Sequence, residues 1–229
     1  TAQQANKIVL LARTVPIEEC KKPTDGLTLF YTDFDRSKIE VREILKMGRH
    51  AVNSNQTFYD GLEVPVEHRI GEDGKGFRYI LDSLNPERVL NAAECVGIGR
   101  RCLEKAVKYA GERVVFGRPI GQNQTIQHPL AENWSELLAA ELLTLHAAEL
   151  YDSGQPCGAQ ANAAKYLAAD AAFKAADQAV RTHGGMGYAA EFHVERYFRE
   201  AVVMRLAPVS REMVLNFIAE RELGLPKSY

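Results

Sequence analysis

Two long stretches of helical sequence follow each other between residues 124 and 183, and they restrict the fold more than any other feature of the chain. Across residues 124–152, apolar side chains recur every three or four positions, as on the buried face of a helix. Residues 158–183 are rich in alanine, the best helix former, which also allows close helix contacts. The Ser-Gly-Gln-Pro sequence at 153–156 separates the two stretches. Two such helices with a short link favour an antiparallel bundle.

Helical sequence also precedes this pair. Residues 77–84 are expected to form a short helix. Asn85 and Pro86 then supply an N-cap and a first-turn proline for a new helix that runs to about Gly111. Within it, the two glycines of residues 96–99 are expected to permit helices to cross closely.

Two shorter helices are expected after a stop at Gly184 and Gly185, at about residues 190–204 and 210–222. Four to five antiparallel helices joined by short links make an up-down bundle. We therefore expect a mainly α protein whose C-terminal four-helix bundle domain covers residues 78–229.

The first third of the chain has a different character, because short runs of β-forming residues alternate with turns. Strand-like runs lie at residues 8–12, 28–34, 39–44 and around 57–59. Asp-Gly pairs and similar turn signals separate them. The pattern predicts three to five antiparallel strands, which is a partial antiparallel β-domain at residues 1–77.

Composition excludes several classes of protein. The chain has 28 Lys and Arg against 30 Asp and Glu, a net charge of −2, without the basic excess of a nucleic-acid-binding protein. It has no run of about 18 uncharged apolar residues, so no membrane span is expected. Its four separated cysteines suit free thiols in a reducing compartment, and neither they nor the histidines have metal-ligand spacing. The chain lacks an initiator Met, and we expect it to be part of a longer protein.

Residues 85–88 (Asn-Pro-Glu-Arg) are a first candidate site. In isolation, Glu87 is most simply an acid in the first turn of a helix, where the helix dipole favours it. The alternative is a general base beside a cation, Arg88, which would orient a substrate carbonyl or phosphate. The dipole would lower the pKa of such a glutamate, so a useful base would need burial in an apolar pocket.

Two further segments have more than one interpretation. Arg113 and Phe116 follow a long helix and either complete its end or hold a phosphate and stack on an adenine or flavin. Residues 184–187 contain three glycines, although one is enough to end a helix. Such a run lets backbone N–H groups approach an anion such as pyrophosphate. Because no strand precedes it, it is not the Rossmann dinucleotide fingerprint.

At these residues the chain resembles the acyl-CoA dehydrogenase family, specifically its C-terminal two-thirds. Seven short signatures occur in the family's order and spacing across nearly all of the chain. They are Lys46-Met47-Gly48, Phe58 with Val64-Pro65, the Gly-Glu-Asp-Gly-Lys-Gly-Phe sequence at 71–77, Leu84 with Glu87-Arg88, Glu112-Arg113 with Phe116-Gly117, His183-Gly184-Gly185 with Gly187-Tyr188, and the Leu-Gly-Leu-Pro tail at 223–226.

The resemblance implies an FAD enzyme with an N-terminal helical domain, a middle β-domain and a C-terminal four-helix bundle, assembled as a homotetramer, a dimer of dimers. We expect the first part to be absent from this chain and the second to be truncated. The implied reaction is the α,β-dehydrogenation of an acyl-CoA, with the α-proton passing to a glutamate and the β-hydride to the flavin. An acceptor of the electron-transfer flavoprotein type is expected, in the bacterial cytoplasm or the mitochondrial matrix.

The resemblance also suggests which residue is the base. Most members place it before the final helix, but alignment on residues 213–219 puts Ala207 or Pro208 there, and neither can take a proton. A minority, resembling isovaleryl-CoA and long-chain acyl-CoA dehydrogenases, carries the base just before the Arg that opens the first bundle helix. That position is Glu87 in this chain.

The remaining site residues follow from the same matching. Asn85 and Arg88 would line the substrate site, although relatives often have Asp at the position of Asn85. The implied contacts to the FAD of a neighbouring subunit are Arg113, Phe116, Gln124, Arg181, Gly184 and Gly185. Arg181 replaces a frequent Gln, which adds charge beside the pyrophosphate.

Three alternatives remain open at this point. The first is an acyl-CoA oxidase-like flavoenzyme that uses oxygen as its acceptor. The second is a non-catalytic helical domain that mediates assembly or holds CoA. The third is a fragment that binds FAD poorly because its N-terminal part is missing.

Overall fold

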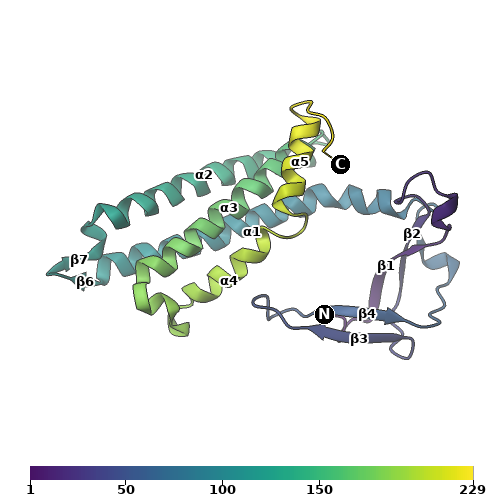
Figure 1. The fold of residues 1–229 in the computed structure, drawn as a ribbon, viewed down its shortest axis with the longest axis horizontal. Helices are drawn as coiled ribbons and strands as arrows, with labels where there is room; N and C mark the ends of the chain where they lie inside the picture. The colour runs from purple at the N-terminus through teal and green to yellow at the C-terminus, as the bar shows by residue number, and fades with distance from the viewer. Residues whose placement is uncertain (229) are drawn as a thin grey trace. The chain divides into compact units, whose positions relative to one another are not determined.

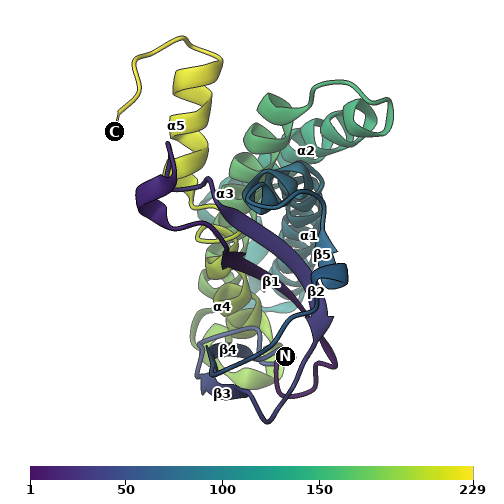
Figure 2. The ribbon, with the colours of Figure 1, turned by 90° about the vertical axis from the view of Figure 1, so that its right-hand side faces the viewer.

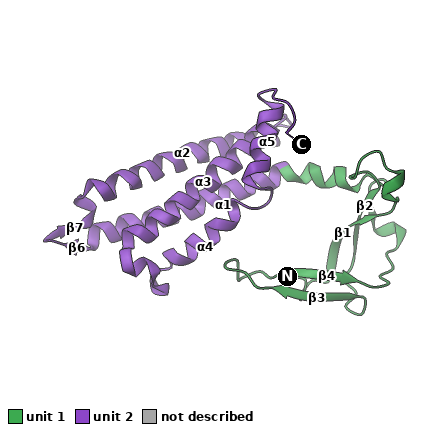
Figure 3. Ribbon diagram, in the orientation of Figure 1, with its two compact units in different colours: residues 1–84 green, residues 85–229 purple. Residues whose placement is uncertain are grey.

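The computed structural model describes residues 1–228 of the chain. The chain divides into two compact units, residues 1–84 and residues 85–229 (Figure 3). The domain limits expected from the sequence, 1–77 and 78–229, stay a prediction, and residue 229 lies outside the described residues.

Unit 1 is built from antiparallel strands. β1 (Lys7–Arg13), β2 (Leu27–Asp33) and β5 (Arg69–Ile70) form one sheet in the order β1-β2-β5, and Figures 1 and 2 show β1 beside β2. β3 (Ile39–Ile44) pairs with β4 (Ser54–Tyr59). Short 3₁₀ turns lie at η1 (Ile17–Glu19) and η2 (Val66–His68). These five strands, all within described residues, confirm the expected three to five.

Hydrogen bonds of the buried Thr28 on β2 hold the glycine-rich segment at 71–77 against that strand. The Thr28 hydroxyl donates to Oδ1 of Asp73 at 2.6 Å and accepts from the Gly74 N–H at 2.7 Å. The hydrogen bonds from Thr28 and then Thr14 lower the pKa of the Asp73 carboxyl. Any Cβ at Gly76 would collide with the backbone of β2, so this close approach requires glycine.

Unit 2 contains the long helices, with α1 (Gly76–Glu112) entering it from unit 1. A short hairpin of β6 (Val114–Val115) and β7 (Arg118–Pro119) and the 3₁₀ turn η3 (Ile120–Gln122) follow α1. Then come α2 (Gln124–Asp152), α3 (Gly158–His183), α4 (Val194–Met204) and α5 (Arg211–Arg221), and between α3 and α4 lie the 3₁₀ turns η4 (Gly184–Tyr188) and η5 (Ala190–Phe192) (Figure 1).

The expected helices at 124–152 and 158–183 are confirmed. The expected last helix is confirmed as α5, and the Ser210 hydroxyl caps it by accepting a hydrogen bond from the Met213 N–H at 3.4 Å. The expected helix at 190–204 is wrong at its start. His193 has a left-handed backbone, with φ of 62°, and separates the turn η5 from α4.

The expectation of two helices meeting at Asn85 and Pro86 is also wrong, because α1 is continuous and contains Pro86. A proline inside a helix removes one backbone hydrogen bond, here to the Asp82 carbonyl, at a cost of about 3 kcal/mol. Both flanks are held by packing. Gly76 lies against β2, and residues after the proline, including Ala92 and Cys95, are fully buried in the bundle. Tertiary packing thus outweighs the local signal for a new helix start at Asn85 and Pro86.

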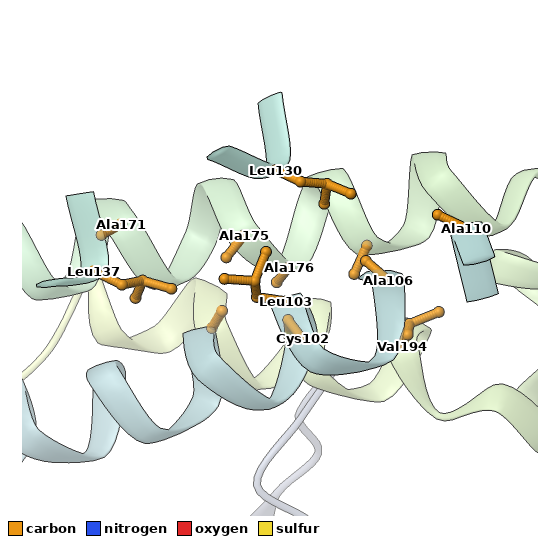
Figure 4. Packing of buried hydrophobic residues seen from close by; sticks show 12 residues of the cluster. Cys102, Leu103, Ala106, Ala110, Leu130, Leu137, Ala171, Ala175, Ala176 and Val194 are labelled. Carbon is orange, nitrogen blue, oxygen red and sulfur yellow. The ribbon is translucent and has the colours of Figure 1, made fainter. Parts of the chain in front are cut away.

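The core of unit 2 lies along α3, whose buried face consists largely of alanine. Figure 4 shows one part of it, where Ala175 and Ala176 face Leu103 and Cys102 of α1. The small side chains bring the helices together, and Gly99 brings them closer still. A Cβ at Gly99 would collide with the Leu137 side chain and lie 3.2 Å from Cα of Ala172. The prediction of a close helix crossing is confirmed at Gly99.

Candidate functional site

The sequence-predicted site residues fall into two groups, one on α1 near the start of α3 and one at the opposite ends of these helices. The first group is Asn85, Glu87 and Arg88. Because α1 begins at Gly76, Glu87 lies in the helix interior and away from the N-terminus of its own helix, so the expected position in a first turn is wrong. In the structure of residues 1–228, the side chains of Asn85 and Arg88 are half-buried, whereas that of Glu87 is exposed.

Arg88 is the most constrained member of this group. Its Nη1 donates to Oδ1 of Asn85 at 3.1 Å. Its Nε is buried and has no hydrogen-bond partner among the described residues. Burial lowers the pKa of the guanidinium, and the neighbouring Glu87 carboxylate opposes this effect. A half-buried cation with an unused donor is suited to holding an oxygen acceptor.

The start of α3 approaches this group, and Phe217 of α5 lies against the start of α3. A Cβ at Gly158, the first residue of α3, would lie 4.0 Å from Nδ2 of Asn85 and 3.5 Å from Cζ of Phe217 on α5. Ala207 and Pro208 lie between α4 and α5. The segment from 206 to 210 (Leu-Ala-Pro-Val-Ser) carries no ionisable side chain, so it offers no alternative base.

The second group begins at the hairpin that follows α1. Phe116 and Gly117 have φ values of 52° and 79°, as a two-residue turn with both centres left-handed requires. Phe116 is fully exposed at the tip, with a relative exposure of 101%. Arg113 and Gln124, on either side of the hairpin, are exposed too. The ring and the guanidinium are therefore available to a ligand or a partner.

The glycine turn at the end of α3 completes the second group. Gly184 ends α3 with φ of 59°, and neither it nor Gly185 has any neighbour within 4 Å of an added Cβ. The expected helix stop is confirmed. Gly187 differs, because a Cβ there would collide with the Val180 carbonyl, so this glycine serves packing. Arg181 is exposed and forms a 3.5 Å ion pair with Asp177.

A stacked pair of rings places these two segments together. The ring centroids of Tyr109 on α1 and His183 on α3 lie 4.2 Å apart. Nδ1 of the buried His183 lies 2.8 Å from the Ala179 carbonyl, so this nitrogen carries the proton, and burial lowers the pKa of the imidazole. Tyr109 precedes Arg113 by one helical turn, and His183 directly precedes Gly184.

The two groups are far apart in one chain. Arg88 and Tyr109 are 21 residues apart on α1, which is roughly 31 Å along a helix axis. The structure therefore brings the catalytic and substrate candidates together, and separately the cofactor candidates, but not all nine residues.

Two charged residues of α3, the buried Lys165 and the half-buried Asp170, were missed by the sequence reasoning. Lys165 is 1% exposed on α3, and Asp170 holds two arginines one turn further along. The signal for Lys165 was its position on the same helical face as the buried alanines 161, 164 and 168. Within residues 1–228, no group of His, Cys, Asp or Glu could hold a metal, and no helix is long and apolar enough to cross a membrane.

Comparison with known proteins gives a consistent result. Residues 74–223 match the family model described as acyl-CoA dehydrogenase, C-terminal domain. Acyl-CoA dehydrogenase FadE12 of Mycobacterium tuberculosis is 45% identical over 176 residues, which are 76% of this chain and 45% of that protein. An acyl-CoA dehydrogenase of Bacillus subtilis is 40% identical over 179 residues, 78% of this chain and 47% of that one.

The fold agrees with these relatives. The structure of glutaryl-coenzyme A dehydrogenase in complex with glutaryl-CoA superposes with a TM-score of 0.91 at 33% identity, covering 99% of this chain and 57% of that one. The chain thus spans about half the length of the proteins that it matches.

Proposed function

The chain belongs to the acyl-CoA dehydrogenase family, and we propose that it takes part in the FAD-dependent α,β-dehydrogenation of an acyl-CoA thioester. The observation that carries this proposal is the family match over residues 74–223, which contains all nine candidate residues. Its relatives are named acyl-CoA dehydrogenases, which are oxidoreductases.

The second group of residues fits a flavin dinucleotide. Phe116 offers an exposed ring for stacking, and Arg113 and Arg181 offer guanidinium groups for phosphate. The open space at Gly184 and Gly185 leaves their backbone accessible to an anion. Gln124 stands beside the hairpin. When bound, FAD would supply the oxidising power of the reaction as hydride acceptor.

We assign Glu87 as the base that removes the α-proton of the substrate. No ionisable side chain lies at the usual position, Ala207 or Pro208. Arg88 and Asn85 would hold and orient the acyl-CoA, and the Arg88 guanidinium would also favour negative charge nearby as the proton leaves. A carboxylate is basic enough for this step only when it is desolvated. Because Glu87 is exposed within the described residues, the proposal requires that substrate or a covering protein segment exclude water from it.

The separation of the two groups supports a homo-oligomer. Cofactor contacts that lie a helix length from the base of the same chain can serve the site of another copy. An apolar stripe on α2, with Trp134 58%, Leu138 37% and Leu145 55% exposed, offers a contact surface. Trp134 and Leu138 also line a groove of about 460 Å³ between α1 and α2, together with Leu103 and Val107 of α1. We propose that copies of the chain associate as a dimer of dimers and that this face forms one of its interfaces.

The reaction is tested by adding butanoyl-CoA to the flavin-loaded protein without oxygen. The proposal predicts loss of the oxidised flavin absorbance and one equivalent of enoyl-CoA for each flavin reduced. Electrons should then pass to an electron-transfer flavoprotein. Rapid peroxide formation in air would instead identify an oxidase, and an unchanged flavin spectrum with acyl-CoA substrates of several lengths would contradict the proposal.

A further inference from the structure

Residues 205–211, which connect α4 to α5 and are called here the connecting segment, are held at both ends by one carboxylate. Oδ1 of Asp170 lies 2.9 Å from Nε of Arg205, and Oδ2 lies 3.4 Å from Nη2 of Arg211. The N–H of Arg211 donates to the Arg205 carbonyl at 3.2 Å. The segment is therefore a closed loop whose two ends share a single anion.

The aromatic residues on either side of Asp170 secure the same two arginines. The Arg205 guanidinium lies 4.8 Å from the ring centroid of Phe173, and the Arg211 guanidinium lies 5.1 Å from that of Tyr166. Arg211 also donates to the Tyr166 hydroxyl at 3.0 Å. Each arginine thus combines an ion pair with a contact to a ring face, which fixes its planar group in orientation as well as position.

Lys165 holds the middle of the connecting segment. Its Nζ donates to the Val209 carbonyl at 2.8 Å, and the side chain is 1% exposed. Burial lowers the pKa of this ammonium, as does the charge of Arg88. Val209 has a φ of 87°, which is strained for a β-branched residue and persists only where the surroundings enforce it.

The connecting segment begins next to α1 residues that lie close to the substrate candidates in the chain. Met204, which directly precedes it, packs in one buried cluster with Ala92 and Cys95 of α1 and with Ala164 and Ala168 of α3, and Val89 packs against that cluster. These α1 residues follow Arg88 by at most two turns. Because residues 206–210 have no ionisable side chain, the segment can act on a substrate through its shape and not through proton transfer.

We propose that Lys165 and Asp170 are positioning residues that hold the connecting segment in one conformation and so fix an apolar wall of the acyl site beside Arg88. The part that concerns the acyl group rests on the proposed function, whereas the holding of the segment does not. Releasing it should weaken the fit of the acyl chain while leaving Glu87 in place. The expected result is a higher KM and weaker discrimination between chain lengths, with a smaller change in kcat.

The test compares Asp170→Asn and Lys165→Met with the control Lys174→Met. Lys174 also lies on α3, but its ion pair is at the surface and is made with Glu136 of α2. Amide hydrogen exchange of residues 206–211 is measured in the full chain. Losing a hydrogen bond or ion pair of a charged group should accelerate this exchange about 10- to 100-fold. The control should match the wild type.

The flavin-loaded protein provides the second readout. For both variants, we expect the KM for butanoyl-CoA to rise about tenfold, with kcat within about threefold, and the kcat/KM ratio between butanoyl-CoA and octanoyl-CoA to move towards one. Should Lys165→Met not fold, Asp170→Asn decides the outcome, since it removes charge with almost no change in volume.

Each negative outcome has its own meaning. Unchanged exchange at 206–211 would overturn the holding of the segment. Faster exchange with unchanged KM and unchanged discrimination would overturn the positioning role. A wild-type protein whose flavin no acyl-CoA reduces would instead overturn the proposed function and the acyl role with it, while the exchange result would still decide whether the two residues hold the segment.

Discussion

Tyr109 and His183 stack with their ring centroids 4.2 Å apart and join the end of α1 to the end of α3. Phe192 closes the pair edge-on, 5.7 Å from Tyr109 and 5.5 Å from His183. The hairpin with Phe116 and the turn with Gly184 extend from the two helix ends that this contact fixes. The relative position of the cofactor candidates therefore depends on a buried, uncharged imidazole.

The stability of the protein should depend on the charge of His183. Burial lowers the pKa of this imidazole below its usual 6.5, so the unfolded state binds a proton more readily. Its contribution is complete above pH 6.5 and is lost as the pH falls from there towards the folded-state pKa. Over that window the free energy of unfolding should fall by at most about 1.4 kcal/mol per pH unit.

Urea denaturation between pH 5 and 8 checks this dependence. His183→Gln should flatten it, whereas His146→Gln, at an exposed position on α2, should leave it as in the wild type. An equally steep dependence in His183→Gln would show that other groups cause it.

Phe116→Ala should weaken FAD binding without weakening the fold. The ring is fully exposed and makes no core contact, so the free energy of unfolding should change by less than about 0.5 kcal/mol. Flavin fluorescence titration and thermal denaturation of the flavin-free protein measure the two quantities. Tyr151→Ala, which removes another exposed ring at the far end of α2, is the control and should leave FAD binding unaltered.

Arg113→Ala should lower FAD retention and tetramer stability together, because we place this guanidinium at the cofactor of a neighbouring copy. Sedimentation velocity and flavin occupancy are measured on the same sample at several protein concentrations. Full flavin occupancy in the variant would contradict the contact across copies.

Gly99→Ala and Gly97→Ala should have opposite effects on stability. A Cβ at Gly99 collides with Leu137, and overpacking of this kind costs about 1–3 kcal/mol. Gly97 lies two residues away on the same helix with nothing within 4 Å, so alanine there should stabilise the helix by about 0.5–1 kcal/mol. Equilibrium denaturation measures both, and equal effects would refute the close crossing.

The helices were predictable where periodicity and end signals agreed. The limits of α2 and α3 were expected to the residue, because Gly154 and Pro156 end one and Gly184 ends the other. The helix start expected at Pro86 was wrong because a proline beside Asn85 is locally typical of a first helical turn. The contacts that keep α1 continuous at this proline are made by Ala92 and Cys95 with residues distant in the sequence, so the local pattern does not reveal them.

The site was predictable in its residue types but not in its geometry. Glycine and aromatic signals pointed to Phe116 and Gly184, and both are accessible. That Phe116 lies a helix length from Glu87 follows from the length of α1, whereas the position of Gly184 near the same helix end follows only from the packing of His183 against Tyr109. The role of Asp170 was not predictable either, because its partners Arg205 and Arg211 are 35 and 41 residues away in the chain.

Flavin reduction by butanoyl-CoA in Glu87→Gln, followed without oxygen by stopped-flow absorbance, tests the assignment of the base most directly. The variant keeps the shape of the side chain but cannot accept the α-proton, so flavin content should stay as in the wild type while reduction slows at least about 100-fold. Glu87→Asp should recover part of the rate. Reduction of Glu87→Gln at the wild-type rate would contradict the account, because the proton would then leave to another group.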